Sequence, residues 1–391
     1  MDEVPELVER LFRQRSGELT AVLTRTLGAR HFELAEEAVQ EALGKALQTW
    51  PFQGMPENPG AWLFRAARNF ALDQLRREQW MVENRSDVLQ RLNACDPFQP
   101  MPATGDDTLA MIYLCCHSSI ALESRVALTL KAVGGLSIAE IARAFLTSPE
   151  TIAQRVIRAK KKIRSGEASF GILPESTHTV MDVLYLMFNE GYSSTSGDEK
   201  LRIDLCDEAI RLARLLPPCP EVHALLALFL FQTARLYDAT RIAEAMWQLN
   251  QSIAGDKLTV LHLEAGIAAA HSSNPVDWLH VVSLYDQLYA LKPTPVVGLN
   301  RGVAIARAES PAAGIRAIEL LEDEPALHGY YLLPATLATL WSENGDQARA
   351  QAYFKKALAC VMNAEERLRF EQKLKTRSAA QVVAGVDQTP T

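Results

Sequence analysis

Residues 134–164 read GGLSIAEIARAFLTSPETIAQRVIRAKKKIR and predict two short helices joined by a tight turn. Ser137 followed by Glu140 forms a capping box, in which each side chain accepts a hydrogen bond from a backbone N–H at the start of the first helix. Ser148 is a typical N-cap and Pro149 a typical first residue, so a second helix follows the first almost at once. This arrangement predicts a helix-turn-helix, a motif that places its second helix in a DNA major groove.

The second helix of this motif separates into an apolar side and a polar, basic side. Its stretch Pro149–Arg164 holds six basic residues and one acidic residue. A plainer alternative is a basic helix end that is solvated and complements the helix dipole. The two caps, the short turn and the sharp division favour DNA reading. The inward residues are Ile152, Val156, Ala159 and Ile163, and the outward residues are Glu150, Gln154, Arg158 and Lys161, flanked by Thr151, Arg155 and Lys162.

A second basic helix is predicted upstream, with Asn58 as N-cap and Pro59 as its first residue. Arginine mixed with aromatic rings suits opened DNA, because rings stack on unpaired bases while guanidinium groups hold the backbone. The same aromatic residues would also suit a protein core, and the periodicity leaves both interpretations open. The residues expected on or beside the basic face are Arg65, Arg68, Asn69, Arg76 and Arg77, with the aromatic Trp50 before the helix.

Residues 34–50, LAEEAVQEALGKALQTW, predict a helix with an acidic outer face. Leu34, Ala38, Ala42 and Leu43 recur at helical spacing and are expected to pack inward. Glu37, Gln40, Glu41 and Gly44 line up on the other side. Such a face would dock a basic partner helix, and ordinary solvation explains it equally well.

Length and composition limit the fold and the function. The 391 residues are enough for two or three domains with sizeable cores. Helical periodicity dominates and alternating β patterns are nearly absent, so the fold class is predicted to be all-α. No apolar run approaches the roughly 20 residues of a membrane span, and the acidic N-terminus lacks a signal sequence, so we expect a cytoplasmic protein without a membrane partner. Six cysteines without a C-x-x-C pair predict reduced thiols.

The pattern divides the chain into three domains and a linker. Residues 1–79 and 108–166 are predicted to be small helical domains, separated by the proline-containing linker 80–107, and 175–377 a larger helical domain. The net charge of −7 lies entirely in the last part. Residues 1–170 hold 21 basic and 21 acidic side chains, whereas 171–391 hold 19 and 26.

The third domain contains a weak internal repeat. Helices are predicted to begin at or just after Asp277, Pro311 and Asp346, positions that are 34 and 35 residues apart. This is the period of tetratricopeptide repeats, whose helix pairs stack because one pair cannot bury its own apolar face. An irregular helical bundle is the alternative.

Sites of enzyme chemistry are not indicated. Cys115, Cys116 and His117 are adjacent rather than at a metal-binding spacing, so buried packing is the expected interpretation. Residues 189–192, NEGY, are expected to form a polar turn with a helix C-cap at Gly191, or else a contact with another domain or an effector. The chain lacks a phosphate-binding loop and a G-x-S-x-G motif, so we expect no catalytic residue, metal or cofactor.

Three motifs together resemble the bacterial RNA polymerase sigma factors of the sigma-70 family, extracytoplasmic-function type. They are AEEAVQEAL at 35–43, PGAWLFRAARNFALDQLRR at 59–77, and GGLSIAEIARAF at 134–145 with the helix SPETIAQRVIRAKKKIR at 148–164. CCH at 115–117, FNEGYSS at 188–194 and PVVGLNRGVAIA at 295–306 are similar to the subgroup with a C-terminal tetratricopeptide-like extension.

The resemblance implies a role for each motif. Glu37, Gln40 and Glu41 would face the clamp helices of the polymerase β′ subunit, with the β flap as a further polymerase contact. The −10 element would be handled by Arg65, Arg68, Asn69, Arg76, Arg77 and the loop from Trp50 to Glu57. The −35 element would be contacted by Ser148, Glu150, Thr151, Gln154, Arg155, Arg158, Lys161 and Lys162.

The expected function is therefore promoter recognition as a polymerase subunit, without covalent chemistry. The C-terminal helical domain is expected to regulate this activity and to offer a surface to a regulatory protein. The alternative is a helix-turn-helix regulator with a tetratricopeptide sensor that binds DNA without being a polymerase subunit.

Overall fold

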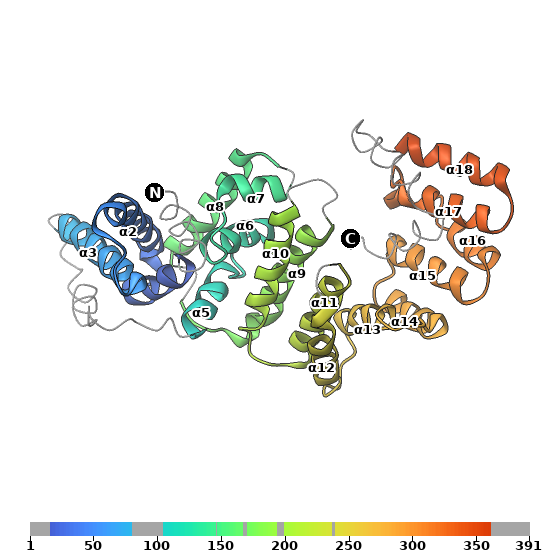
Figure 1. Ribbon diagram of the computed structural model, residues 1–391, viewed down its shortest axis with the longest axis horizontal. Helices are drawn as coiled ribbons and strands as arrows, with labels where there is room; N and C mark the ends of the chain where they lie inside the picture. Colours follow the sequence, from blue (N-terminus) through green and yellow to red (C-terminus); the bar gives the residue numbers. More distant parts are fainter. Residues whose placement is uncertain are drawn as a thin grey trace. The chain divides into compact units, whose positions relative to one another are not determined.

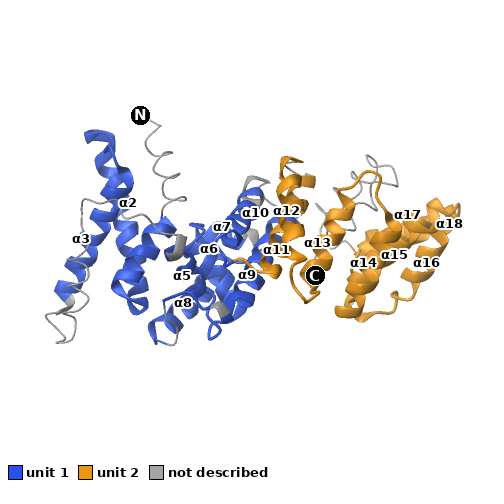
Figure 2. Cartoon of the chain, turned by 90° about the horizontal axis from the view of Figure 1, so that it is seen from below, with its two compact units in different colours: residues 1–217 blue, residues 218–391 orange. Residues whose placement is uncertain are grey.

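The computed structural model describes residues 16–79, 105–145, 147–166, 170–193, 199–236 and 239–360. Within these ranges every regular element is a helix (Figure 1), which confirms the predicted all-α class. The chain forms two compact units, residues 1–217 and residues 218–391 (Figure 2). Residues 80–104 of the predicted linker, residues 1–15 and residues 361–377 of the predicted third domain lie outside the described residues.

The first part of unit 1 is a small bundle of helices around one apolar core. Trp50, Leu63 and Leu75 are buried there with residues of the helical segment 16–27. Asn58 caps the helix that begins at Pro59, as predicted, because the N–H of Ala61 donates to the side-chain oxygen of Asn58 at 3.0 Å. The elements after segment 16–27 are η1 (Ala29–His31), α2 (Phe32–Gln53) and α3 (Pro59–Gln79).

The second part of unit 1 contains the predicted helix-turn-helix. Ser137 and Glu140 exchange the two hydrogen bonds of a capping box, at 2.8 and 3.2 Å. Ser148 accepts from the N–H of Thr151 at 3.2 Å, so both predicted caps are confirmed. The elements are α5 (Gly105–Cys115), α6 (Leu122–Ala132), α7 (Ile138–Ala144) and α8 (Pro149–Arg164).

Helix α5 begins three residues before the predicted domain start at 108, and an ion pair accounts for the difference. Asp107 is buried and lies 2.8 Å from the guanidinium of Arg25. Its carboxylate therefore belongs to the packed structure rather than to a solvated linker. At the other end of α5, Cys115 and Cys116 are fully buried free thiols, which confirms their packing role. Burial is the main cause that raises the pKa of Cys116 to about 12.

Two further helices, α9 (Thr177–Ser193) and α10 (Glu199–Ala213), belong to unit 1. Helix α9 packs on α5 and α6, and the Tyr113 and Thr177 hydroxyls lie 2.6 Å apart. The predicted boundary at 175 therefore differs from the division between the units at 217, because α9 buries an apolar face on the helices before it. The turn predicted at 189–192 was wrong, since α9 continues through Gly191 to Ser193.

Unit 2 is a series of antiparallel helices, each packed on the next along the chain. Asp277, Ser310 and Asp346 each accept a hydrogen bond from a backbone N–H three residues later, which confirms these helix starts. The elements are α11 (Pro220–Leu236), η3 (Ala239–Arg241), α12 (Ile242–Ser252), α13 (Val260–His271), α14 (Trp278–Leu291), α15 (Pro295–Ala308), α16 (Pro311–Glu319), η4 (Pro325–Leu327), α17 (Leu332–Glu343) and α18 (Gln347–Cys360).

Helices α15 and α16 approach each other unusually closely through two glycines. A Cβ atom placed on Gly314 would lie 2.3 Å from the Cβ of Ala306, and one on Gly302 would lie 2.4 Å from a side-chain carbon of Ile318. Only residues without a side chain fit at these two positions. None of the helices in the described ranges has the length and apolar character needed to cross a membrane.

Candidate nucleic-acid interface

Helix α8 presents a polar ridge to solvent and an apolar stripe to the core. The predicted inward residues Ile152, Val156, Ala159 and Ile163 are all buried. The predicted outward residues Glu150, Gln154, Arg158 and Lys161 are all exposed. At 100° per residue these four lie within about 80° of one another around the helix, so they form one continuous ridge. The predicted division of the helix is confirmed.

The residues flanking this ridge are partly used for structure. The Ser148 hydroxyl is exposed but takes part in the N-cap, and Thr151 is half-buried against it, with the two hydroxyl oxygens 3.1 Å apart. Hydrogen bonds from the backbone and from Ser148 lower the pKa of Glu150, so this exposed carboxylate is ionised at neutral pH. An ionised carboxylate accepts from the cytosine amino group, whereas it repels a phosphate.

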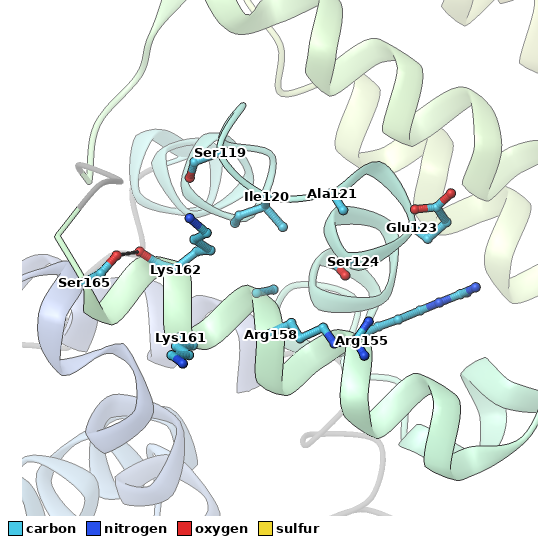
Figure 3. A pocket seen from close by; sticks show the side chains of 11 residues that line it. Ser119, Ile120, Ala121, Glu123, Ser124, Arg155, Arg158, Lys161, Lys162 and Ser165 are labelled. Atoms are coloured by element: carbon cyan, nitrogen blue, oxygen red, sulfur yellow. Dashed lines mark hydrogen bonds between the residues drawn. The ribbon is translucent and has the colours of Figure 1, made fainter.

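Four of the six basic residues of α8 surround one cavity. This cavity, of about 690 Å³, lies between α8 and the segment 119–124 at the start of α6 (Figure 3). Two serine hydroxyls, of Ser119 and Ser124, lie on the opposite wall, and Glu123 is its acidic lining residue. Positive charge and hydroxyl donors around a solvent-open cavity attract phosphate oxygens. The basic residues that line it are Arg155, which is half-buried, and Arg158, Lys161 and Lys162, which are exposed.

The other two basic residues of α8 pair with helix α2. Lys160 lies 2.5 Å from the carboxylate of Glu36, with both side chains mostly buried, and Arg164 lies 3.1 Å from Glu33. The ammonium group of Lys160 also lies 5.9 Å from the centre of the Phe32 ring. The two flanks of α8 therefore differ in use, because one faces a solvent-open basic cavity and the other holds the helix against α2.

Helix α3 offers fewer predicted contact residues than the sequence indicated. Arg65, Asn69, Arg76 and Arg77 are exposed. Arg68 is 8% exposed and lies on the buried side, because it is one turn before Leu72 and two turns before Leu75 of the core. Placing Arg68 on the exposed basic face was therefore wrong.

Trp50 is likewise a core residue rather than an exposed ring. It is 3% exposed and its ring meets that of Trp62 edge to face at 5.4 Å. The sequence pattern could not separate it from Phe52, which lies two residues later and is 87% exposed. Phe52 is thus the exposed aromatic side chain at this end of α2, and Met55 beside it is 53% exposed.

The predicted polymerase-facing side of α2 is open to solvent. Glu37, Gln40 and Glu41 are all exposed. Ala35, Ala38 and Ala42 on the other side are buried against α3 and segment 16–27. The acidic face is therefore held on a rigid helix and is available to a partner.

These two helical domains match two known families in order. Residues 11–81 match sigma-70 region 2, and residues 110–163 match sigma-70 region 4. Together, a region 2 domain and a helix-turn-helix region 4 domain define a sigma factor, the promoter-recognition subunit of RNA polymerase. The chain belongs to the sigma-70 family and is a transcription initiation factor.

The remaining comparisons concern the C-terminal part and the whole chain. Residues 176–253 match a family of unknown function, DUF6596. The chain is 33% identical over 382 residues to an uncharacterized protein of Rhizobium meliloti (strain 1021), in an alignment that covers 86% of this chain and 88% of that protein. No solved structure matches.

One exposed residue beside the polar ridge of α8 was not expected from the sequence. Ile157 is 64% exposed and lies three residues after Gln154 and four before Lys161. Its helical position already placed it on the outward arc, but its apolar character set it apart from the polar residues considered there. The Glu36–Lys160 pair was missed for another reason, because its partners are 124 residues apart and no local pattern connects them.

Proposed function

We propose that this chain is a sigma factor of the extracytoplasmic-function type, with a tetratricopeptide-like C-terminal extension that regulates it. The observation that carries the proposal is the continuous exposed ridge of α8 beside a basic cavity. This combination provides side chains for base edges and cations for the flanking phosphates on one helix. Ser148, Thr151 and the lining residues Arg155 and Lys162 would fix the register of α8 on the −35 element.

The acidic face of α2 is proposed to bind core RNA polymerase. Glu37, Gln40 and Glu41 complement a basic surface on the clamp helices of β′, while the region 4 domain would meet the β flap. Charges at the rim of such a contact increase the association rate and favour one orientation.

The exposed side of α3 is proposed to contact the −10 element. Arg65, Asn69, Arg76 and Arg77 would hold the phosphate backbone, and the exposed ring of Phe52 would stack on an unpaired base. Phe52 takes this part in place of Trp50, which supports the fold from the core.

The C-terminal helices are proposed to act on the sigma domains. Support comes from the sequential packing of α11 to α18 and from the starts of α14, α16 and α18, which are 33 and 36 residues apart, close to the tetratricopeptide period. An array of this kind presents an extended surface to a regulatory protein.

Purified core RNA polymerase provides the test of the proposed function. The full-length chain should co-purify with core enzyme and support run-off transcription from its own promoters. The double variant Glu37→Lys, Glu41→Lys should lose co-purification, because reversing two charges changes the net charge of the docking face by four units.

The matched control changes the same charge elsewhere. Asp323→Lys with Glu324→Lys alters two exposed acidic residues of unit 2 and should leave co-purification unchanged. If the wild-type chain binds specific DNA but neither binds core enzyme nor starts transcription, the protein is a polymerase-independent regulator instead.

A further inference from the structure

Ile157 stands out because it is an exposed apolar residue at the edge of a polar ridge. A single exposed apolar residue is ordinary on a protein surface and carries no meaning by itself. The position of this one does, since Gln154 lies one turn before it and Lys161 one turn after it, and both are exposed. The apolar residues that α8 needs for packing, Ile152, Val156, Ala159 and Ile163, already fill its buried side.

A base edge in the major groove offers one apolar feature, the C5-methyl group of thymine. Gln154 and Ile157 are three residues apart, which separates them by about 4.5 Å along the helix axis. Successive base pairs are separated by about 3.4 Å, so the two side chains face the same or neighbouring base pairs when α8 lies along the groove. A glutamine amide pairs well with adenine, and an aliphatic side chain beside it suits an adjacent methyl group.

We infer that Ile157 determines specificity by contacting a thymine methyl group within the −35 element. The inference rests on the proposed function, since it requires α8 to lie in the major groove. The cations on the cavity side, Arg155 and Lys162, would hold the flanking phosphates and keep the isoleucine against the base edges.

The test replaces thymine by uracil, which removes the methyl group and changes nothing else on the base edge. Preferred −35 sequences are first selected from a random DNA library with the full-length chain bound to core RNA polymerase. Each thymine of the selected sequence is then replaced singly by deoxyuridine. One replacement should weaken wild-type binding about three- to fivefold, the loss expected for one buried methyl group.

Variants of Ile157 test whether this residue causes the preference for thymine over uracil. Ile157→Ala should bind the thymine and uracil sequences equally, and Ile157→Val should retain part of the preference. Ile253→Ala, at a 71% exposed isoleucine of unit 2, is the matched control and should keep the full preference. Because Ile157 is exposed, thermal unfolding of these variants should match the wild type.

Failures of the inference and of the proposed function are separable. If a −35 sequence is selected and Gln154→Ala or Arg158→Ala relaxes it, α8 reads the DNA. Equal binding to every uracil replacement, or an unchanged thymine preference in Ile157→Ala, then overturns the role of Ile157 alone. If no sequence is selected, or if α8 variants leave it unaltered, the proposed function fails and the inference with it.

Discussion

Gly314 illustrates how the array in unit 2 depends on the absence of one methyl group. Its missing Cβ allows α16 to approach Ala306 and the carbonyl oxygen of Gly302, positions that a Cβ would meet at 2.3 and 2.8 Å. Gly314→Ala should therefore destabilise unit 2 by roughly 1–3 kcal/mol through overpacking. Thermal or urea unfolding of the full-length chain measures this change.

The control is a helical glycine in open space. A Cβ on Gly44 of α2 would have no neighbouring atom within 4 Å, so Gly44→Ala should be neutral or stabilise the protein by up to about 1 kcal/mol. Equal effects at both glycines would contradict the close contact of α15 and α16.

The carboxyl group of Glu190 should make the stability of unit 1 depend on pH. Burial raises its pKa above the ordinary value. The folded state therefore binds this proton more tightly than the unfolded state, and stability falls as pH rises through the unfolded value of about 4.3 towards the folded one. Glu190→Gln should raise the melting temperature at pH 7, and the gain should shrink on acidification to pH 4.

An exposed carboxyl just before the start of α9 serves for comparison. Glu175→Gln should leave the melting temperature unchanged at either pH, because its side chain is exposed. A Glu190→Gln gain of the same size at pH 4 and pH 7 would show that shape, rather than charge, is responsible.

At the scale of the element, the ridge and the cavity rim of α8 should give different binding phenotypes. Arg158 lines the cavity but also lies on the ridge, so Arg158→Ala should cost about 1–3 kcal/mol and relax sequence preference if ridge residues reach base edges as proposed. Lys162→Ala at the cavity should weaken binding to all sequences alike and reduce the slope of log affinity against log salt by about one.

Filter binding or fluorescence anisotropy at several salt concentrations separates the two phenotypes. Lys355→Ala, an exposed lysine of α18, should leave both specificity and salt slope unchanged. A uniform loss for both α8 variants would assign the whole helix to phosphate contacts.

Helix starts were predictable from the sequence because caps are local. Ser148, Asn58 and Asp277 each accept a hydrogen bond from a backbone N–H three residues later. The type of the capping residue and its place in the sequence were therefore sufficient to predict the helix start. Faces of helices were predictable only where one side was clearly apolar, as in α8. On α3 the apolar arc is wide, and the burial of Arg68 depends on the position of α2, which local periodicity does not encode.

At the scale of the whole molecule, the division at residue 217 changes how the extension should be removed. Truncation after Gly166 would delete α9 and α10 and uncover the surface of α5 and α6 on which α9 packs. Truncation after Pro217 keeps unit 1 complete. We expect the 1–217 chain to fold with a cooperative transition and the 1–166 chain to be less stable by thermal unfolding.

The same truncation tests the regulatory role of unit 2. Residues 171–217 hold eight acidic and four basic side chains, and residues 218–391 hold 18 and 15, so more than half of the acidic excess stays in unit 1. Simple electrostatic masking by unit 2 is therefore weak, and we expect the 1–217 chain to be less active than the full chain in run-off transcription. Higher activity would indicate masking, and equal activity would indicate another role.

Domain boundaries and long-range pairs were the least predictable features. The loss of periodicity near 171 predicted a boundary there, but α9 packs both on α10 after it and on α5 and α6 before it. Similarly, Arg25 and Asp107 form an ion pair across 82 residues of sequence. Such contacts depend on how the helices fold back on one another.

The ion pairs between α8 and α2 limit the distance between the two proposed DNA-contacting surfaces. Promoter elements centred at −10 and −35 are 25 base pairs apart, or about 85 Å along a straight duplex. Helix α8, at 16 residues, is about 24 Å long and α2, at 22 residues, about 33 Å. Because α3 lies against α2, the two proposed reading surfaces span less than about 60 Å while Lys160 holds Glu36. Simultaneous occupation of both elements on straight DNA thus requires the ion pairs between α8 and α2 to break. The free energy needed to break them reduces the affinity for a complete promoter.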